Sequence, residues 1–155
     1  MDIEFREIDF FNVWIWVEFA TVPATTERQY IEEVFDSWFF LGKLGGFNAE
    51  NAQVQETGLE LSYLDYSEDH AEQSFMALMH NMGNVEFLGL WARCWFDLGT
   101  SDAIALDVLI NAFRQLNRDY VEIKHLIIGG ENEDWPVPDT TSDTFYDVDA
   151  NRLAN

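Results

Sequence analysis

Residues 85–113 read VEFLGLWARCWFDLGTSDAIALDVLINAF, and this stretch contains two different hydrophobic periods. Between residues 85 and 98 the side chains alternate between an aliphatic set and an aromatic set, and this alternation predicts a strand. Between residues 101 and 118 apolar side chains recur every three or four positions, which predicts an amphipathic helix. A strand that leads at once into a helix is the first part of a βαβ unit.

The same order of patterns occurs once earlier in the chain. Residues 12–20 alternate like a strand, and residues 26–41 have the apolar spacing of a helix. Weaker patterns predict a helix over 69–82 and strands over 3–8, 58–65 and 120–128.

Two βαβ units in succession predict an α+β fold, and the ferredoxin-like split βαβ sandwich is the most economical arrangement of them. In that arrangement the two main helices cover one face of an antiparallel or mixed sheet. We expect strands 12–20 and 85–98 to lie side by side and parallel at the centre of the sheet. The helix over 69–82 is then an extra short element.

The chain of 155 residues is long enough for one domain with one core. From about residue 131 acids and prolines become frequent and periodic apolar residues become few. Such a segment buries too little surface to offset its ordering entropy. The composition therefore predicts a single α+β domain over residues 1–138 and an acidic, flexible tail over 139–155. The first residues of the acidic segment, through Trp135 and Val137, can still dock on the domain.

The charge of the chain excludes one class of partner. The chain has 8 Lys and Arg residues against 29 Asp and Glu residues, a formal net charge of −21. Nucleic-acid binding needs clustered cations that displace counterions from phosphates, so no nucleic-acid partner is expected. Docking on an anionic membrane is disfavoured for the same reason. No apolar run approaches the roughly 20 residues that cross a bilayer, and the N-terminus lacks the basic region of a signal peptide. We therefore expect a cytoplasmic protein without membrane insertion.

No catalytic residue, metal site or cofactor is predicted. A single cysteine, Cys94, excludes an internal disulfide and a zinc site built on several thiolates. His70, His80 and His125 share no metal-ligand spacing with one another or with Cys94. Cys94 falls on the aliphatic side of its strand, where we expect an inert core residue.

Five residues form the candidate interaction surface. Trp14 and Trp16 on one predicted strand, and Trp91, Arg93 and Trp95 on another, alternate away from the aliphatic positions. Large aromatic side chains with an arginine are typical anchors of protein interfaces. RNA-binding modules also place aromatics on such strands, but LGLWARCW lacks their basic and glycine-aromatic pattern.

Three interpretations of this face stay open at the level of sequence. The helix over 69–82 or the N-terminal segment can bury it within the chain. A protein partner or a second copy can cover it instead, or it can line a small-molecule pocket. A separate signal, Leu98 to Asp102, places glycine and hydroxyl groups before a predicted helix, where helix capping is favoured over anion binding.

Three segments resemble an uncharacterised domain-of-unknown-function family of cyanobacteria and chloroplasts. They are SWFFLGKLGGFNAEN (37–51), WARCWFDLGTSDAIALDVLINAF (91–113) and IIGGENEDWPVP (127–138). The resemblance implies a cyanobacterial cytoplasmic protein with plastid relatives in the stroma. It implies no activity, cofactor or catalytic residue.

These observations together favour a non-enzymatic protein-interaction module with an assembly or regulatory role in photosynthetic cells. Its partner would be another protein or a second copy of the chain. A small-ligand-binding regulatory domain and an enzyme of unknown reaction are the alternatives.

Overall fold

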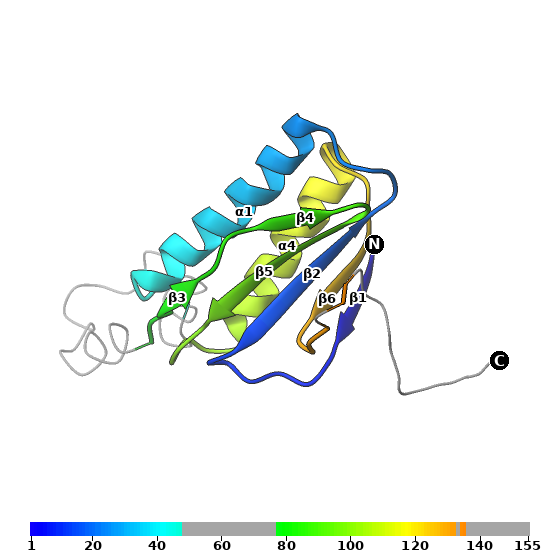
Figure 1. The fold of residues 1–155 in the computed structure, drawn as a ribbon. Helices are drawn as coiled ribbons and strands as arrows, with labels where there is room; N and C mark the ends of the chain where they lie inside the picture. Colours follow the sequence, from blue (N-terminus) through cyan, green and yellow to red (C-terminus); the bar gives the residue numbers. More distant parts are fainter. Residues whose placement is uncertain (48–76, 133, 136–155) are drawn as a thin grey trace.

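The computed structural model of the chain describes residues 1–47, 77–132, 134 and 135 (Figure 1). These residues form an α+β fold with one mixed sheet and two helices. The strands are β1 (Asp2–Phe5), β2 (Val13–Phe19), β3 (Asn81–Met82), β4 (Glu86–Leu88), β5 (Trp91–Asp97) and β6 (Ile123–Ile128). The helices are α1 (Thr25–Lys43) and α4 (Ile104–Asp119).

The strand order is β1-β6-β2-β5-β3, and β4 also pairs with β5. β2 therefore lies between the two later strands β5 and β6, and it is antiparallel to both. β1 is the exception in direction, because it extends the sheet by pairing parallel to β6. The centre of the sheet thus consists of strands that are far apart in the chain.

The prediction that strands 12–20 and 85–98 are parallel is wrong, although the two are adjacent. Val13 pairs with Phe96 in an antiparallel register. The physical reason is the connection through α1, which leads into the edge strands β3 and β4 and not directly into β5. The chain then reverses between β4 and β5, so β5 runs against β2.

That reversal also corrects the prediction of one continuous strand over 85–98. Leu88 pairs with Trp91, which leaves a two-residue turn of Gly89 and Leu90. Gly89 has a φ of 59°, a conformation that tight hairpin turns require and glycine adopts readily. The turn shifts the alternation of side chains in β4 relative to β5. Phe87 therefore pairs with Ala92 and packs against the core.

Other predicted elements differ in length or lie outside the described residues. β1 and β6 are shorter than the predicted strands over 3–8 and 120–128. The predicted helix over 69–82 is wrong in its described part, because residues 77–80 are not helical and Asn81–Met82 form β3. The rest of that helix, the strand over 58–65 and the tail over 139–155 lie outside the described residues.

Both helices lie on one face of the sheet, behind it in Figure 1. α1 buries Ile31, Phe35 and Trp38 at helical spacing, and Phe35 packs edge-on against Phe113 of α4 at 5.2 Å between ring centroids. The Trp38 indole N–H donates to the Ala105 carbonyl at 2.8 Å and joins the two helices. The main core therefore fills the space between this helix pair and the aliphatic side of the sheet.

The segment before β3 is fastened to the end of α1 at a glycine. A Cβ atom on Gly42 would lie 2.2 Å from the Met79 sulfur, and the Met79 N–H donates to the Gly42 carbonyl at 3.0 Å. Gly42 thus gives Met79 its place in the core. None of the helices in the described part of the chain is long and apolar enough to cross a membrane.

Candidate functional site

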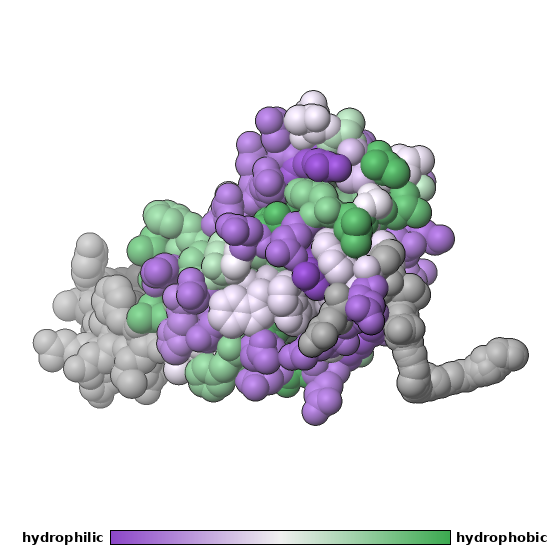
Figure 2. Space-filling model, in the orientation of Figure 1, coloured by the Kyte–Doolittle hydropathy of each residue, from purple (hydrophilic) through white to green (hydrophobic). Residues whose placement is uncertain are grey.

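The tryptophans of β2 and β5 lie on the face of the sheet opposite α1 and α4. Trp14 pairs with Trp95, Trp16 with Arg93, and Glu18 with Trp91. The five residues expected to form an interaction surface therefore occupy adjacent positions, which we call the aromatic face. Figure 2 shows this side of the molecule, where pale aromatic surface lies among hydrophilic side chains.

The aromatic face has a buried floor and a more exposed upper layer. Trp16 and Trp91 are only 1% and 5% exposed, and with Ile127 of β6 they form an apolar cluster separate from the main core. Trp14, Arg93 and Trp95 are half-buried. Two of the four tryptophans are therefore structural, and the other two retain accessible surface.

Part of the cover comes from Trp135, which follows β6. Its ring meets Trp16 edge-on at 6.1 Å between centroids. The Arg93 guanidinium lies 4.4 Å from the Trp135 ring centroid and 4.5 Å from that of Trp14. Arg93 therefore lies within cation–π distance of both indole rings, which is a favourable arrangement.

Two glycines at the end of β6 bring the chain to this position. Gly129 and Gly130 have φ values of 103° and 76°. The Gly129 N–H donates to the Trp14 carbonyl at 2.8 Å, and the Gly130 N–H donates to the Glu7 carbonyl at 3.1 Å. A Cβ atom on Gly129 would lie 2.6 Å from that same Glu7 oxygen. Only glycine fits, and this glycine pair is the signal in the sequence that could have linked Trp135 to the aromatic face.

Two hydrogen bonds connect the segment after β6 to the half-buried Trp95 through Asn12. The Trp95 indole N–H donates to Asn12 Oδ1 at 2.7 Å, and Asn12 Nδ2 donates to Glu131 Oε2 at 3.3 Å. The buried Trp16 indole differs, because its N–H has no hydrogen-bond partner among the described residues. The described part of the aromatic face therefore contains an unsatisfied donor.

Acidic side chains surround the aromatic face. Arg93 Nε lies 2.6 Å from Glu86 Oε1, so a carboxylate already neutralises this cation. His125 Nδ1 lies 3.2 Å from Glu18 Oε1 on the next strand. Glu4 of β1 lies opposite Ile127 in the same row of the sheet and is paired with Arg6 at 2.6 Å. The net charge of −21 on the whole chain thus repels anions and favours cationic groups.

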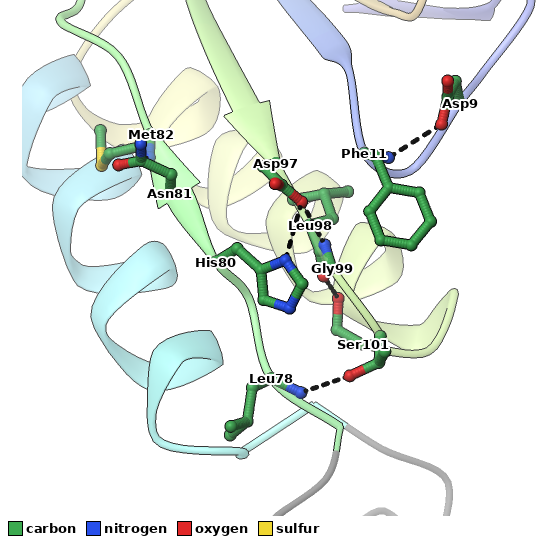
Figure 3. Close-up of polar contacts among 11 residues, drawn as sticks. Asp9, Phe11, Leu78, His80, Asn81, Met82, Asp97, Leu98, Gly99 and Ser101 are labelled. Carbon is green, nitrogen blue, oxygen red and sulfur yellow. Dashed lines mark hydrogen bonds and ion pairs between the residues drawn. The ribbon is translucent and has the colours of Figure 1, made fainter.

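A second cluster of polar residues lies where β5 ends (Figure 3). His80 Nδ1 is 3.3 Å from Asp97 Oδ1, and the same oxygen accepts the Gly99 N–H at 2.9 Å. The Ser101 hydroxyl donates to the Leu98 carbonyl at 2.6 Å.

Hydroxyl groups in this loop fasten it to its neighbour and do not cap α4. The Thr100 hydroxyl accepts the Leu78 N–H at 3.1 Å and so holds the loop to the segment before β3. The expectation that Thr100 or Ser101 caps the helix is wrong, because α4 begins later, at Ile104, with Ala103 as its N-cap. The His80 side chain is exposed, and the hydroxyls near it make structural hydrogen bonds.

Cys94 is buried in the core, as expected from its position on the aliphatic side of β5. Burial raises the pKa of the Cys94 thiol to about 12, and the nearby carboxylates of Asp36 and Glu86 also raise it. The reactive thiolate is therefore scarce at neutral pH. Within the described ranges, no group of three or more His, Cys, Asp or Glu side chains could hold a metal ion.

The sequence matches a known family over residues 1–143, a range that includes every described helix and strand as well as Trp135. The chain belongs to DUF3531, a family of proteins of unknown function. No curated protein and no solved structure matches the chain. The DUF3531 match therefore gives membership without an activity, and function has to be argued from the aromatic face itself.

Proposed function

We propose that this DUF3531 protein is a non-enzymatic interaction module that binds a protein partner through the aromatic face. The observation that carries the proposal is the pair of layers on the helix-free side of the sheet. Half-buried Trp14, Arg93 and Trp95 lie above the buried floor of Trp16 and Trp91. Tryptophan and arginine are the residue types most often found as anchors at the centre of protein interfaces, where a rigid floor holds them in place.

The charge of the chain supports a basic protein as the partner. A net charge of −21 attracts cationic surfaces and speeds their encounter with this one. Glu4, Glu18 and Glu86 lie in the rows of the sheet that contain the aromatic residues. Because Arg93 is already paired with Glu86, the aromatic face offers little attraction to a phosphate group.

The sheet order supports a ferredoxin-like classification of the fold. Strands β6-β2-β5-β3 alternate in direction, and α1 and α4 are the two crossover helices on one face. This order supports a split βαβ sandwich, to which β1 would add one parallel edge strand. Among the described residues, no helix covers the face of the sheet opposite α1 and α4, which supports it as the binding surface.

An assembly or regulatory role in the cytoplasm of photosynthetic cells completes the proposal. It is supported by the resemblance of residues 37–51, 91–113 and 127–138 to proteins of cyanobacteria and chloroplasts.

The test is affinity capture from a cyanobacterial lysate with three purified variants beside the wild type. Trp95→Thr and Trp14→Thr change the half-buried layer and spare the buried floor. Phe40→Ser is the matched control, because Phe40 is 62% exposed on α1, on the other side of the sheet. Thermal unfolding shows first that each variant is folded.

We expect a protein captured by the wild type and by Phe40→Ser to be lost with Trp95→Thr and Trp14→Thr. Aromatic anchors commonly contribute more than about 2 kcal/mol of binding each, so the loss should be nearly complete. A captured set that is the same for wild type and both tryptophan variants would reject the aromatic face as the binding surface.

A further inference from the structure

We infer that Trp135 is an internal ligand of the aromatic face, and that it occupies the place taken by an aromatic side chain of the partner. The partner segment carries Lys or Arg next to that aromatic residue. This inference rests on the proposed function and names the chemistry of the partner at the same site.

The contacts of Trp135 are those of a ligand held by its side chain. The ring meets the Arg93 guanidinium at 4.4 Å and the Trp16 ring at 6.1 Å. No backbone hydrogen bond joins the described residues 131, 132, 134 and 135 to the sheet, although the Glu131 carboxylate accepts the Asn12 side-chain N–H at 3.3 Å. Within the described part of the chain, the backbone hydrogen bonds of Gly129 and Gly130 are the last before Trp135. Trp135 can therefore leave Arg93 without breaking a described backbone hydrogen bond of the sheet.

The net charge of the chain opposes the docking of this segment. Glu131 and Asp134 bring two more acids to a chain of net charge −21, on a face where Arg6 is already paired with Glu4 at 2.6 Å. The Arg93 cation that attracts them is itself paired with Glu86 at 2.6 Å. Ring stacking on Arg93 and Trp16 thus opposes a like-charge repulsion, and a peptide with lysines in place of the acids keeps the stacking and gains attraction.

The floor of the aromatic face also has an unsatisfied hydrogen-bond donor. The buried Trp16 indole N–H has no partner among the described residues while Trp135 lies against its ring. A buried donor without an acceptor is unfavourable, and a carbonyl oxygen from a bound peptide can relieve it. Trp135 is consequently an incomplete occupant, which a partner segment can improve upon.

The experiment measures binding of a fluorescein-labelled peptide, GKKWKKG, to the full chain by fluorescence anisotropy. The proteins are wild type, Trp135→Ala, and Trp135→Ala combined with Arg93→Gln. The control peptides are GKKAKKG, which lacks the aromatic side chain, and GEEWEEG, which reverses the charge. Trp135→Ala should bind GKKWKKG about tenfold or more tightly than the wild type, because vacating the site raises the fraction of competent molecules.

Both control peptides should bind Trp135→Ala at least about tenfold more weakly, and the Arg93→Gln double variant should lose binding. Equal affinity of wild type and Trp135→Ala for GKKWKKG would overturn the inference that Trp135 is an internal ligand. Equal binding of GEEWEEG would overturn the basic partner. Binding that survives Arg93→Gln would place the peptide elsewhere. Concentration-dependent dimers of Trp135→Ala in sedimentation would make a second copy the occupant and overturn the heterologous partner.

A measurement on the wild type avoids any dependence on the folding of these variants. Labelling with 5-fluorotryptophan places a fluorine NMR probe on each of the six tryptophans, and the Trp135 signal is the one that Trp135→Ala removes. Saturating GKKWKKG should move the Trp135 signal to the position of an exposed indole, and an unmoved signal would contradict the exchange. The lysate experiment tests the proposed function through Trp14 and Trp95 and does not involve Trp135. If the partner is captured as expected but Trp135→Ala leaves the affinity for GKKWKKG unchanged, the inference about Trp135 is rejected and the proposed function stands.

Discussion

Two buried tryptophans of this protein have opposite hydrogen-bonding states. The Trp38 indole N–H donates to the Ala105 carbonyl, whereas the Trp16 indole N–H has no partner among the described residues. Both side chains are at most 3% exposed, so they lie away from bulk solvent. A buried unsatisfied donor costs about 1–3 kcal/mol, while a made hydrogen bond contributes about 1 kcal/mol. The same chemical group thus stabilises the helix pair and destabilises the aromatic face.

The different hydrogen bonding of Trp38 and Trp16 predicts that the same substitution lowers the free energy of unfolding by different amounts at the two positions. Trp38→Phe and Trp16→Phe remove the same volume and the same N–H group. Trp38→Phe should lower the free energy of unfolding by at least about 1 kcal/mol more than Trp16→Phe. Urea denaturation of both variants, fitted with a shared slope, measures the difference. An equal or larger loss at Trp16 would mean that its donor has an acceptor after all.

At the scale of single elements, two glycines with positive φ have different surroundings. Gly89 turns the β4–β5 hairpin in open space, where no atom beyond its chain neighbours lies within 4 Å of the position that a Cβ atom would take. Gly129 ends β6 against the Glu7 carbonyl, only 2.6 Å from such a Cβ atom. Backbone conformation alone disfavours alanine at both positions, and steric overlap disfavours it further at Gly129.

Gly89→Ala should therefore cost about 1–2 kcal/mol of stability, the usual cost of a left-handed non-glycine residue. Gly129→Ala should cost at least about 1 kcal/mol more, because a backbone oxygen cannot move aside as a flexible side chain can. Chemical denaturation of both variants checks this order. Similar losses at the two sites would show that the end of β6 can rearrange, and Trp135 with it.

The elements that could be predicted from the sequence are those whose pattern is local. Strict alternation placed β2 within one residue at each end, and helical spacing placed α1 and α4. The same alternation correctly separated Trp14 and Trp16 from Val13 and Ile15. The alternation of side chains along residues 85–98 is not interrupted by the two-residue turn. Gly89 was therefore the only sign in the sequence of the break between β4 and β5. Strand direction and the docking of Trp135 depend on connections between distant segments, which no local period records.

At the scale of the whole molecule, a net charge of −21 on 155 residues makes self-repulsion a substantial force. Mutual repulsion of like charges destabilises a compact state more than an expanded chain. Salt screens this repulsion, with a Debye length that falls from about 30 Å at 0.01 M to about 3 Å at 1 M.

The melting temperature should consequently rise by about 3 °C or more when NaCl is raised from 0.01 M to 0.5 M at pH 7. Differential scanning calorimetry at constant protein concentration measures the shift. A melting temperature that stays constant or falls in NaCl would show that ion pairs such as Arg93–Glu86 outweigh the overall repulsion.

The pairing of β1 with β6 has a consequence for how the chain reaches its fold. Residues 2–5 pair with residues 125–128, and the partners of β2 are β5 and β6. β1 and β2, the two strands that precede α1, therefore remain unpaired until strands more than 70 residues further along the chain have been synthesised. At about 5–20 residues per second, the wait for β6 is on the order of 10 s. We expect the sheet to form in one late, slow step of high contact order, with Ile3 and the β2 aromatics exposed to chaperones until then.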